Sequence, residues 1–378
     1  MAQLLELPNE LLFLIARYLP YQKDINSFVQ TSRQLYVLLN VFLCKFNIQH
    51  HQSSALTWAA SNGNDHLAKR MLEAGASIAS FDTSETSENP LLCAVIAGHI
   101  STLKVMLSEK RPDRASSPFQ KRRVLLFAIE SSDREVIDLM IENDAPLNPF
   151  PDDRRGDSTL GIAALGQCDP TIFARLLQAG ARTHRGEQPD TFSMVMTPGH
   201  PGRSQIVELL LEQNCQPSSE EALRRIVRQN DKAIFQLFVD HGFEIDIYGH
   251  AALFQAILER EDEMVELLLE NGANPHLQCQ YPDDDGVFHY RSSIWCAIRF
   301  RNWKMLDLLL SKGVHPDPAD LAFAIERDEK KAIALLSQFS YESVPVKITL
   351  PDFIKHMEDE RVKTDPNFVP KDWWPRVS

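Results

Sequence analysis

One unit recurs along most of this chain, and it constrains the fold more than any other feature. Each unit opens with an apolar residue followed three positions later by a small one, as in Leu56 and Ala59. An apolar doublet such as Met71-Leu72 follows about fifteen residues after the start, and then comes a Gly, Asn or Asp such as Gly75. These last residue types tolerate the left-handed conformation that ends a helix. Each unit therefore predicts two short helices closed by a cap.

The repeat starts are spaced by roughly 33 residues, and repeats of this length stack helical pairs side by side. A single pair cannot bury its own apolar side, so the units are expected to form a solenoid. The predicted starts are Leu56, Leu91, Leu125, Leu160, Val195, Leu223, Leu253, Ile294 and Leu321.

Residues 266–274 and 54–63 resemble ankyrin repeats, and the resemblance extends over roughly residues 50 to 340. It implies an all-α fold in which a short N-terminal module precedes an ankyrin-repeat solenoid of about eight to nine helical pairs. It also implies a protein-binding role. The opening motif of the family is degenerate here, because its histidine position holds residues such as Thr57, Leu92 and Phe254.

Residues 1–48 do not follow the repeat and are predicted to form three helices. The first opens at Pro8, which suits the first position of a helix, and ends before Pro20. The second carries Asp24 near its start, and Ser32 is the predicted N-cap of the third. So short a segment cannot hide all of its apolar side chains alone. The remainder is expected to pack on the first repeat and on a partner.

The order of residues in this module resembles the F-box, beginning with Leu7-Pro8-Asn9-Glu10-Leu11-Leu12 and closing with Thr31-Ser32-Arg33. F-box modules bind the Skp-type adaptor of cullin-based ubiquitin ligases, so the resemblance implies a Skp-type adaptor and a cullin as partners. The alternative is a plain helical cap that seals the first repeat. The resemblance assigns to the adaptor contact, or to the core behind it, Leu7, Pro8, Leu11, Leu12, Ile15, Leu19, Ile25 and Phe28.

Aromatic and arginine side chains dominate binding surfaces, and they gather in the second half of the chain. Trp295 lies in this stretch and is expected to pack between repeats. The target itself cannot be read from the sequence, because repeat proteins choose partners through surface residues that follow no code. The predicted target-binding residues are Trp58, Phe288, Tyr290, Arg291, Arg299, Arg301 and Trp303.

No motif for catalysis or for a bound cofactor is present in the sequence. The stretch from Gly199 to Gly202 is predicted to be a turn, and Asp283-Asp284-Asp285 with His289 a solvated acidic loop rather than a cation site. We therefore predict no catalytic residue, no metal and no cofactor. An enzyme built on a repeat scaffold stays a third possibility, because scattered catalytic residues leave no motif.

The formal net charge of −13 disfavours binding to nucleic acid or to an anionic membrane. The six cysteines lack the close spacing of a zinc site, and no apolar run is long enough to span a bilayer. The acidic residues near the N-terminus argue against a signal peptide. We expect a cytoplasmic or nuclear protein with free thiols.

Three segments are predicted: an F-box-like domain over 1–48, an ankyrin domain over 49–340 and a tail over 341–378. The tail contains Trp373-Trp374 and is expected to fold back on the last repeat, the alternative being a flexible binding peptide. The short link after the module predicts a rigid joint. The predicted function is a substrate-recognition adaptor of a Skp–cullin–F-box ubiquitin ligase, with a ubiquitin-independent ankyrin scaffold or inhibitor as the alternative.

Overall fold

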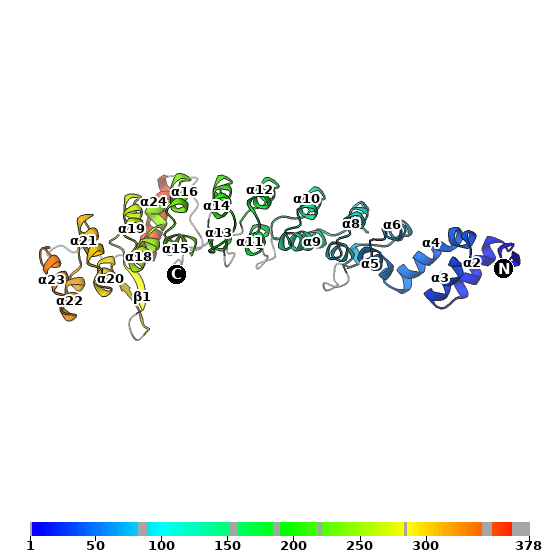
Figure 1. The fold of residues 1–378 in the computed structure, drawn as a ribbon, viewed down its shortest axis with the longest axis horizontal. Coiled ribbons are helices and arrows are strands. Elements are labelled where there is room, and N and C mark those ends of the chain that lie inside the picture. The colour runs from blue at the N-terminus through cyan, green and yellow to red at the C-terminus, as the bar shows by residue number, and fades with distance from the viewer. Residues whose placement is uncertain are drawn as a thin grey trace. The chain divides into compact units, whose positions relative to one another are not determined.

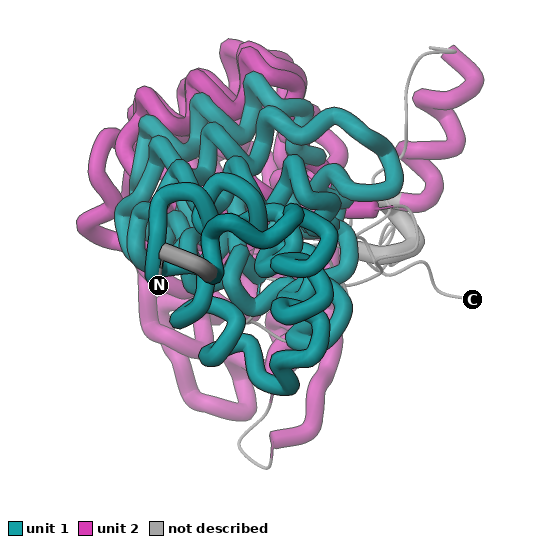
Figure 2. Tube along the Cα trace, turned by 90° about the vertical axis from the view of Figure 1, so that its right-hand side faces the viewer, with its two compact units in different colours: residues 1–147 teal, residues 148–378 magenta. Residues whose placement is uncertain are grey.

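The computed structural model describes residues 2–81, 89–150, 158–183, 190–215, 217, 221–282, 286–341 and 350–364. These residues form two compact units, 1–147 and 148–378 (Figure 2).

The first unit opens with four helices rather than three: α1 (Ala2–Leu5), α2 (Asn9–Tyr18), α3 (Gln22–Gln30) and α4 (Arg33–His50) (Figure 1). Pro8 is the residue before α2, one position earlier than expected, and its carbonyl accepts from the backbone N–H groups of Leu11 and Leu12. Ser32 caps α4 as predicted, because its hydroxyl accepts from the Leu35 N–H at 3.1 Å. Helix α4 also continues past the predicted module boundary.

Helical pairs follow the N-terminal module in the first unit. Each pair consists of two neighbouring helices joined by a short turn, which is the arrangement that the repeat predicts. The pairs are α5 (Ser54–Ser61) with α6 (Asp65–Ala74), α7 (Pro90–Ile96) with α8 (Ile100–Leu107), and α9 (Pro118–Glu130) with α10 (Arg134–Glu142). A short 3-10 helix, η1 (Ala79–Phe81), lies between the first two pairs.

The second unit continues the same pattern. Its pairs are α11 (Thr159–Leu165) with α12 (Pro170–Gln178), α13 (Thr191–Val195) with α14 (Arg203–Glu212), α15 (Glu221–Arg228) with α16 (Lys232–Asp240), α18 (His250–Glu259) with α19 (Asp262–Glu270), α20 (Ser293–Arg299) with α21 (Trp303–Ser311), and α22 (Pro318–Glu326) with α23 (Lys330–Leu336). The short helix α17 (Ile245–Tyr248) precedes α18, and α24 (Leu350–Thr364) follows the last pair. The predicted all-α repeat solenoid is confirmed.

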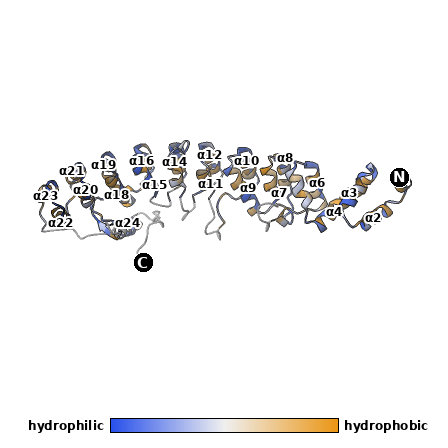
Figure 3. Ribbon diagram, turned by 60° about the horizontal axis from the view of Figure 1, so that its bottom comes forward, coloured by the Kyte–Doolittle hydropathy of each residue, from blue (hydrophilic) through white to orange (hydrophobic). Residues whose placement is uncertain are grey.

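The predicted turn residues reverse the chain as expected. Gly75, Gly180 and Gly272 have φ values of 110°, 102° and 94°, in the region that favours glycine. Asp144 and Asn214 adopt positive φ as well, at 56° and 55°. The small residues of the repeat are fully buried, Ala59 and Ala128 among them, which lets neighbouring helices approach closely. Most helices show both hydrophilic and hydrophobic residues in Figure 3, as amphipathic helices do.

One predicted repeat start is wrong. Val195 is the last residue of α13, and Phe192 holds the second position of that helix, as Leu160 does in α11. The turn between α13 and α14 is longer than in the other pairs, because Pro198 to Gly202 form extra turns before α14 begins. Counting backward from the doublet Leu210-Leu211 by the usual spacing therefore stops at Val195, three residues short of the true start at Phe192.

The insertion before α20 forms a β-hairpin, which the sequence reading did not predict. Strands β1 (Cys279–Pro282) and β2 (Phe288–Arg291) pair antiparallel, with Cys279 opposite Arg291 and Tyr281 opposite His289. The acidic residues 283–285 lie outside the described residues. In the tail, the described contact of α24 is with α17, whereas the prediction placed the tail on the last repeat. Trp373 and Trp374 lie outside the described part of the chain.

Candidate functional site

The N-terminal module has a small core of its own. Leu12, Ala16, Ile25 and Val29 from α2 and α3 are buried against Leu35 and Leu39 of α4. Leu7, Leu19 and Phe28 are partly buried around this core, Ile15 is half-buried, and Pro8 is exposed. Of the predicted adaptor contacts, Leu12 and Ile25 therefore belong to the core behind the surface.

Apolar side chains remain exposed on the outside of the same module. Leu11, Leu14 and Tyr18 follow one side of α2 at helical spacing and are 43%, 44% and 85% exposed. Val37 and Val41 repeat this pattern on α4, at 73% and 55%. We call these five residues the apolar module surface. Single exposed apolar residues are ordinary, but two helical rows on one small module are typical of an interaction surface.

A buried asparagine joins the module to the first repeat. Asn47 of α4 is 2% exposed, and its Nδ2 donates to Gln22 Oε1 at 3.0 Å and to Ser54 Oγ at 3.2 Å. The Ala55 N–H donates to Asn47 Oδ1 at 3.1 Å. These bonds tie α3 and α4 to the start of α5, and Arg70 of α6 lies 5.5 Å from the centroid of the Tyr36 ring. The contacts support a rigid joint within the first unit.

The predicted target-binding residues are divided between the two compact units. Trp58 lies on α5 in the first unit and is 55% exposed. In the second unit, Phe288 and Tyr290 are exposed on β2 and Arg291 is half-buried at its end. Arg299, Arg301 and Trp303 follow at the end of α20 and the start of α21, where Arg301 Nε donates to Glu329 Oε1 at 2.7 Å.

Aromatic rings outside the predicted set complete this region. Trp295 is 7% exposed and packs between Tyr281 of β1 and Phe323 of α22, at centroid distances of 5.8 and 5.0 Å. Its expected role between repeats agrees with this placement. Neither Tyr281 nor Phe323 was predicted. A signal was present, because Phe254, Trp295 and Phe323 follow successive repeat starts by one or two residues.

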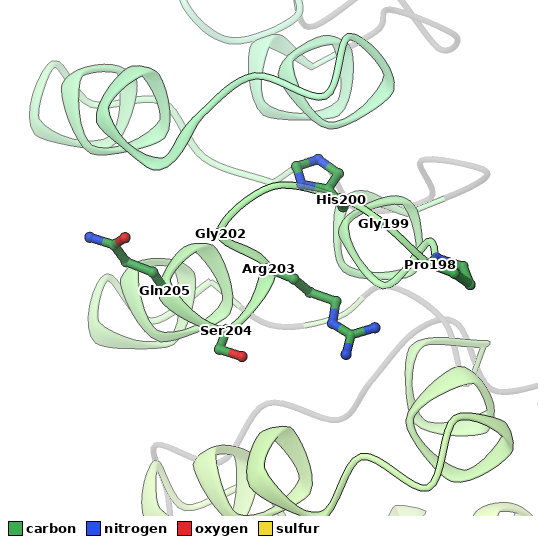
Figure 4. Close-up of a pocket in the computed structure, with 7 residues that line it drawn as sticks. All are labelled: Pro198, Gly199, His200, Gly202, Arg203, Ser204 and Gln205. Carbon is green, nitrogen blue, oxygen red and sulfur yellow. The ribbon is translucent and has the colours of Figure 1, made fainter.

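An open hollow of about 580 Å³ lies at the start of α14 (Figure 4). Its lining includes Gly199, His200 and Gly202, which belong to the stretch from Gly199 to Gly202 that was predicted as a turn. Arg203 does not offer a free charge there, because its guanidinium contacts Asp231 and Gln229. In Figure 4 the ring of His200 extends away from Arg203, and it packs against Phe173 at 6.4 Å. The arrangement does not build an anion site.

Burial shifts the pKa of three cysteine thiols and of one histidine. It raises the pKa of the thiols of Cys44, Cys93 and Cys296, which disfavours the reactive thiolate. It lowers the pKa of His250 to about 4, so this imidazole is neutral near pH 7. The Asn274 N–H donates to His250 Nδ1 at 2.7 Å, a bond that requires the neutral ring acceptor.

Within the described ranges, no group of three or more His, Cys, Asp or Glu residues could hold a metal ion. The acidic stretch 283–285 falls outside those ranges. Nor is any described helix both long and apolar enough to cross a membrane.

A family model of ankyrin repeats in three copies matches residues 30–116 and 194–279. No curated protein matches the chain. The first match begins at residue 30 and so includes α4, which the sequence reading assigned to a separate module. The two matches fall in different compact units and cover helical pairs from both. The chain therefore contains ankyrin repeats, whose helical scaffold typically serves as a protein-interaction module.

Proposed function

We propose that this chain is a substrate-recognition adaptor of a Skp–cullin–F-box ubiquitin ligase. In this proposal, the N-terminal module binds a Skp-type adaptor and the ankyrin repeats bind the protein to be modified. The observation that carries it is the apolar module surface. The module leaves Leu11, Leu14 and Tyr18 exposed although its own core is closed by Leu12 and Leu39. An accessible apolar surface beside a complete core is available to a partner.

The hydrogen bonds of Asn47 fix the orientation of the N-terminal module relative to the first repeats. Because α3, α4 and α5 share the hydrogen bonds of one buried side chain, the module and the first repeats hold a fixed mutual orientation. A target bound by the repeats would then be kept near the ubiquitin-charged subunit. The rate gain would come from raised effective concentration, with the chemistry supplied by other subunits.

The test is capture of a purified Skp-type adaptor by the full-length chain. The double variant Leu11→Asp with Leu14→Asp changes exposed positions, so we expect a folded protein that loses capture at least tenfold. Burying a leucine-sized side chain is worth about 1.5–3 kcal/mol, and a charge in its place adds a desolvation cost. Val287→Asp is the matched control, because Val287 is also exposed but lies beside the hairpin of the second unit. Capture that survives the double change rejects the proposal.

A second candidate function is a ubiquitin-independent ankyrin scaffold. One observation favours it: α4 packs against α6 as α6 packs against α8, so α4 also acts as an end helix of the stack. The family match beginning at residue 30 agrees with that role. Copurification separates the two candidates, since only the ligase function requires an adaptor and a cullin to accompany the chain from cells.

A further inference from the structure

Four side chains from three elements of the second unit form a continuous stack. The Arg291 guanidinium at the end of β2 lies 4.7 Å from the centroid of the Trp295 ring on α20. Trp295 packs on Phe323 of α22 at 5.0 Å and an interplanar angle of 33°. The Arg327 guanidinium lies 5.1 Å from the centroid of Phe323. We call this stack of Arg291, Trp295, Phe323 and Arg327 the cationic ladder.

The Arg291 end of the ladder has hydrogen-bond donors without acceptors. Arg291 Nε and Trp295 Nε1 are both buried, and neither has a partner in the described part of the chain. Buried donors are nearly always paired in folded proteins, and an unpaired one costs about 1–3 kcal/mol. The two donors belong to side chains joined by a cation–π contact, and the described residues supply an acceptor to neither of them.

The charge of Arg291 also lacks an ion-pair partner among the described residues. Arg203 and Arg301 each contact a carboxylate, of Asp231 and Glu329, whereas Arg291 has no carboxylate partner among the described residues. The Asp320 carboxylate accepts from the Ser292 hydroxyl at 2.5 Å and from the Asp317 backbone N–H at 2.9 Å.

The strand that leads to the ladder is open to solvent. Phe288 and Tyr290 are exposed on β2, at 63% and 39%, immediately before Arg291. An extended segment laid along this strand would bring its side chains onto these rings and reach the guanidinium at the strand end. A carboxylate suits that end, since it accepts from both the Arg291 guanidinium and the indole N–H.

We propose that the cationic ladder binds an acidic peptide segment of the target protein, one carboxylate of which accepts from Arg291 and Trp295. Phe288 and Tyr290 pack along the same segment. The inference deepens the proposed function, because it takes the repeats as the part of the chain that binds the target. It specifies that the recognised segment is negatively charged and that Arg291 and Trp295 bind its carboxylate.

The test uses fluorescence anisotropy with the purified full-length chain and a labelled peptide of five Glu-Gly units. Its counterparts carry Gln, Lys or phosphoserine in place of Glu. We expect the Glu peptide to bind about tenfold more tightly than the Gln peptide, as a charge-assisted hydrogen bond of about 1.4 kcal/mol would give. Net negative charge on the protein works against this result, so general electrostatics cannot produce it.

Two variants address the named atoms. Arg291→Gln removes the charge, and Trp295→Phe removes the indole N–H while it keeps a ring in the stack, so each should reduce affinity for the Glu peptide severalfold or more. Arg225→Gln is the matched control, because Arg225 is also partly buried but pairs with Glu221 on α15, and it should leave binding unchanged. Equal binding of the Glu and Gln peptides, full affinity in Arg291→Gln, or a preference for the phosphoserine or Lys peptide overturns the proposal.

Adaptor capture by the same preparations separates this inference from the proposed function. Loss of peptide discrimination with intact capture rejects only the ladder. Peptide discrimination that depends on Arg291, in a chain that does not capture the adaptor, rejects only the ligase function.

Discussion

The phenol of Tyr248 donates a 2.6 Å hydrogen bond to Oε1 of Glu358, and both side chains are almost fully buried. The bond joins α17 to α24, two helices separated by more than a hundred residues. Most of the neighbouring residues of α24 from Lys355 to Thr364 are exposed. A polar contact therefore contributes much of the described attachment of this helix, together with Arg361, which lies 4.0 Å from Asp246.

Tyr248→Phe should loosen α24 without unfolding the repeats. The change deprives a buried carboxylate of one donor, which typically costs about 1–3 kcal/mol. Hydrogen exchange of residues 350–364 should accelerate roughly 5- to 100-fold, since 1.4 kcal/mol corresponds to about a factor of ten. Tyr290→Phe removes a phenol from the exposed hairpin and serves as control. Unchanged exchange in α24 would show that other contacts hold the helix.

The stability of the region around His250 should fall in mild acid. Its pKa is lowered to about 4 in the folded chain, whereas an unfolded histidine titrates near 6.5, so between these values the unfolded state binds more protons. The contribution is fully present above the unfolded pKa and is lost as the pH falls toward 4. At pH 5 the loss is about 2 kcal/mol.

His250→Asn isolates this effect, because its amide oxygen can still accept from the Asn274 N–H and does not titrate. Hydrogen exchange of α18 should speed up between pH 7.5 and pH 5 in the wild type, after correction for the intrinsic rate. The variant should show a smaller change. Identical pH profiles for the two proteins would mean that His250 is not the responsible group.

Local chemistry explains what the sequence could predict. The left-handed caps at Gly75 and Asn214 and the N-cap at Ser32 depend on the residue itself and its nearest neighbours, so the pattern alone locates them. The shift of the fifth start to Phe192 depends on a lengthened turn. No fixed period can register a local insertion of that kind.

The candidate site was predictable only in part, because it depends on contacts between repeats. Phe288, Tyr290 and Arg291 are adjacent in the sequence and were recognised together. Phe323 and Arg327 join them through stacking across the next helical pair, which composition does not reveal. The sequence also does not reveal which side chains are exposed. Leu11 and Leu12 are adjacent leucines, yet Leu11 is 43% exposed and Leu12 is fully buried.

That contrast gives a matched pair of variants. Leu12→Ala should destabilise the N-terminal module by about 2–5 kcal/mol, because it leaves a cavity among Ile25, Val29 and Leu39. Leu11→Ala removes the same atoms from a half-exposed position and should cost less than about 1 kcal/mol. Limited proteolysis within α2–α4 measures the difference. Equal effects of the two changes would contradict the assignment of Leu12 to the core.

Asn47→Ala should loosen the joint between the module and the first repeat. The change leaves the Ala55 N–H without its side-chain acceptor and removes the bonds to Gln22 and Ser54, at a cost of about 1–3 kcal/mol. The core of the module does not include Asn47, so α2 should stay protected while hydrogen exchange at the end of α4 and the start of α5 accelerates. Asn26→Ala, on the exposed side of α3, is the control and should change neither segment. Hydrogen exchange at the end of α4 and the start of α5 that is as slow in Asn47→Ala as in the wild type would contradict this role. Packing of α4 on α6 would then fix the orientation of the module, and a target bound by the repeats would be positioned without the hydrogen bonds of Asn47.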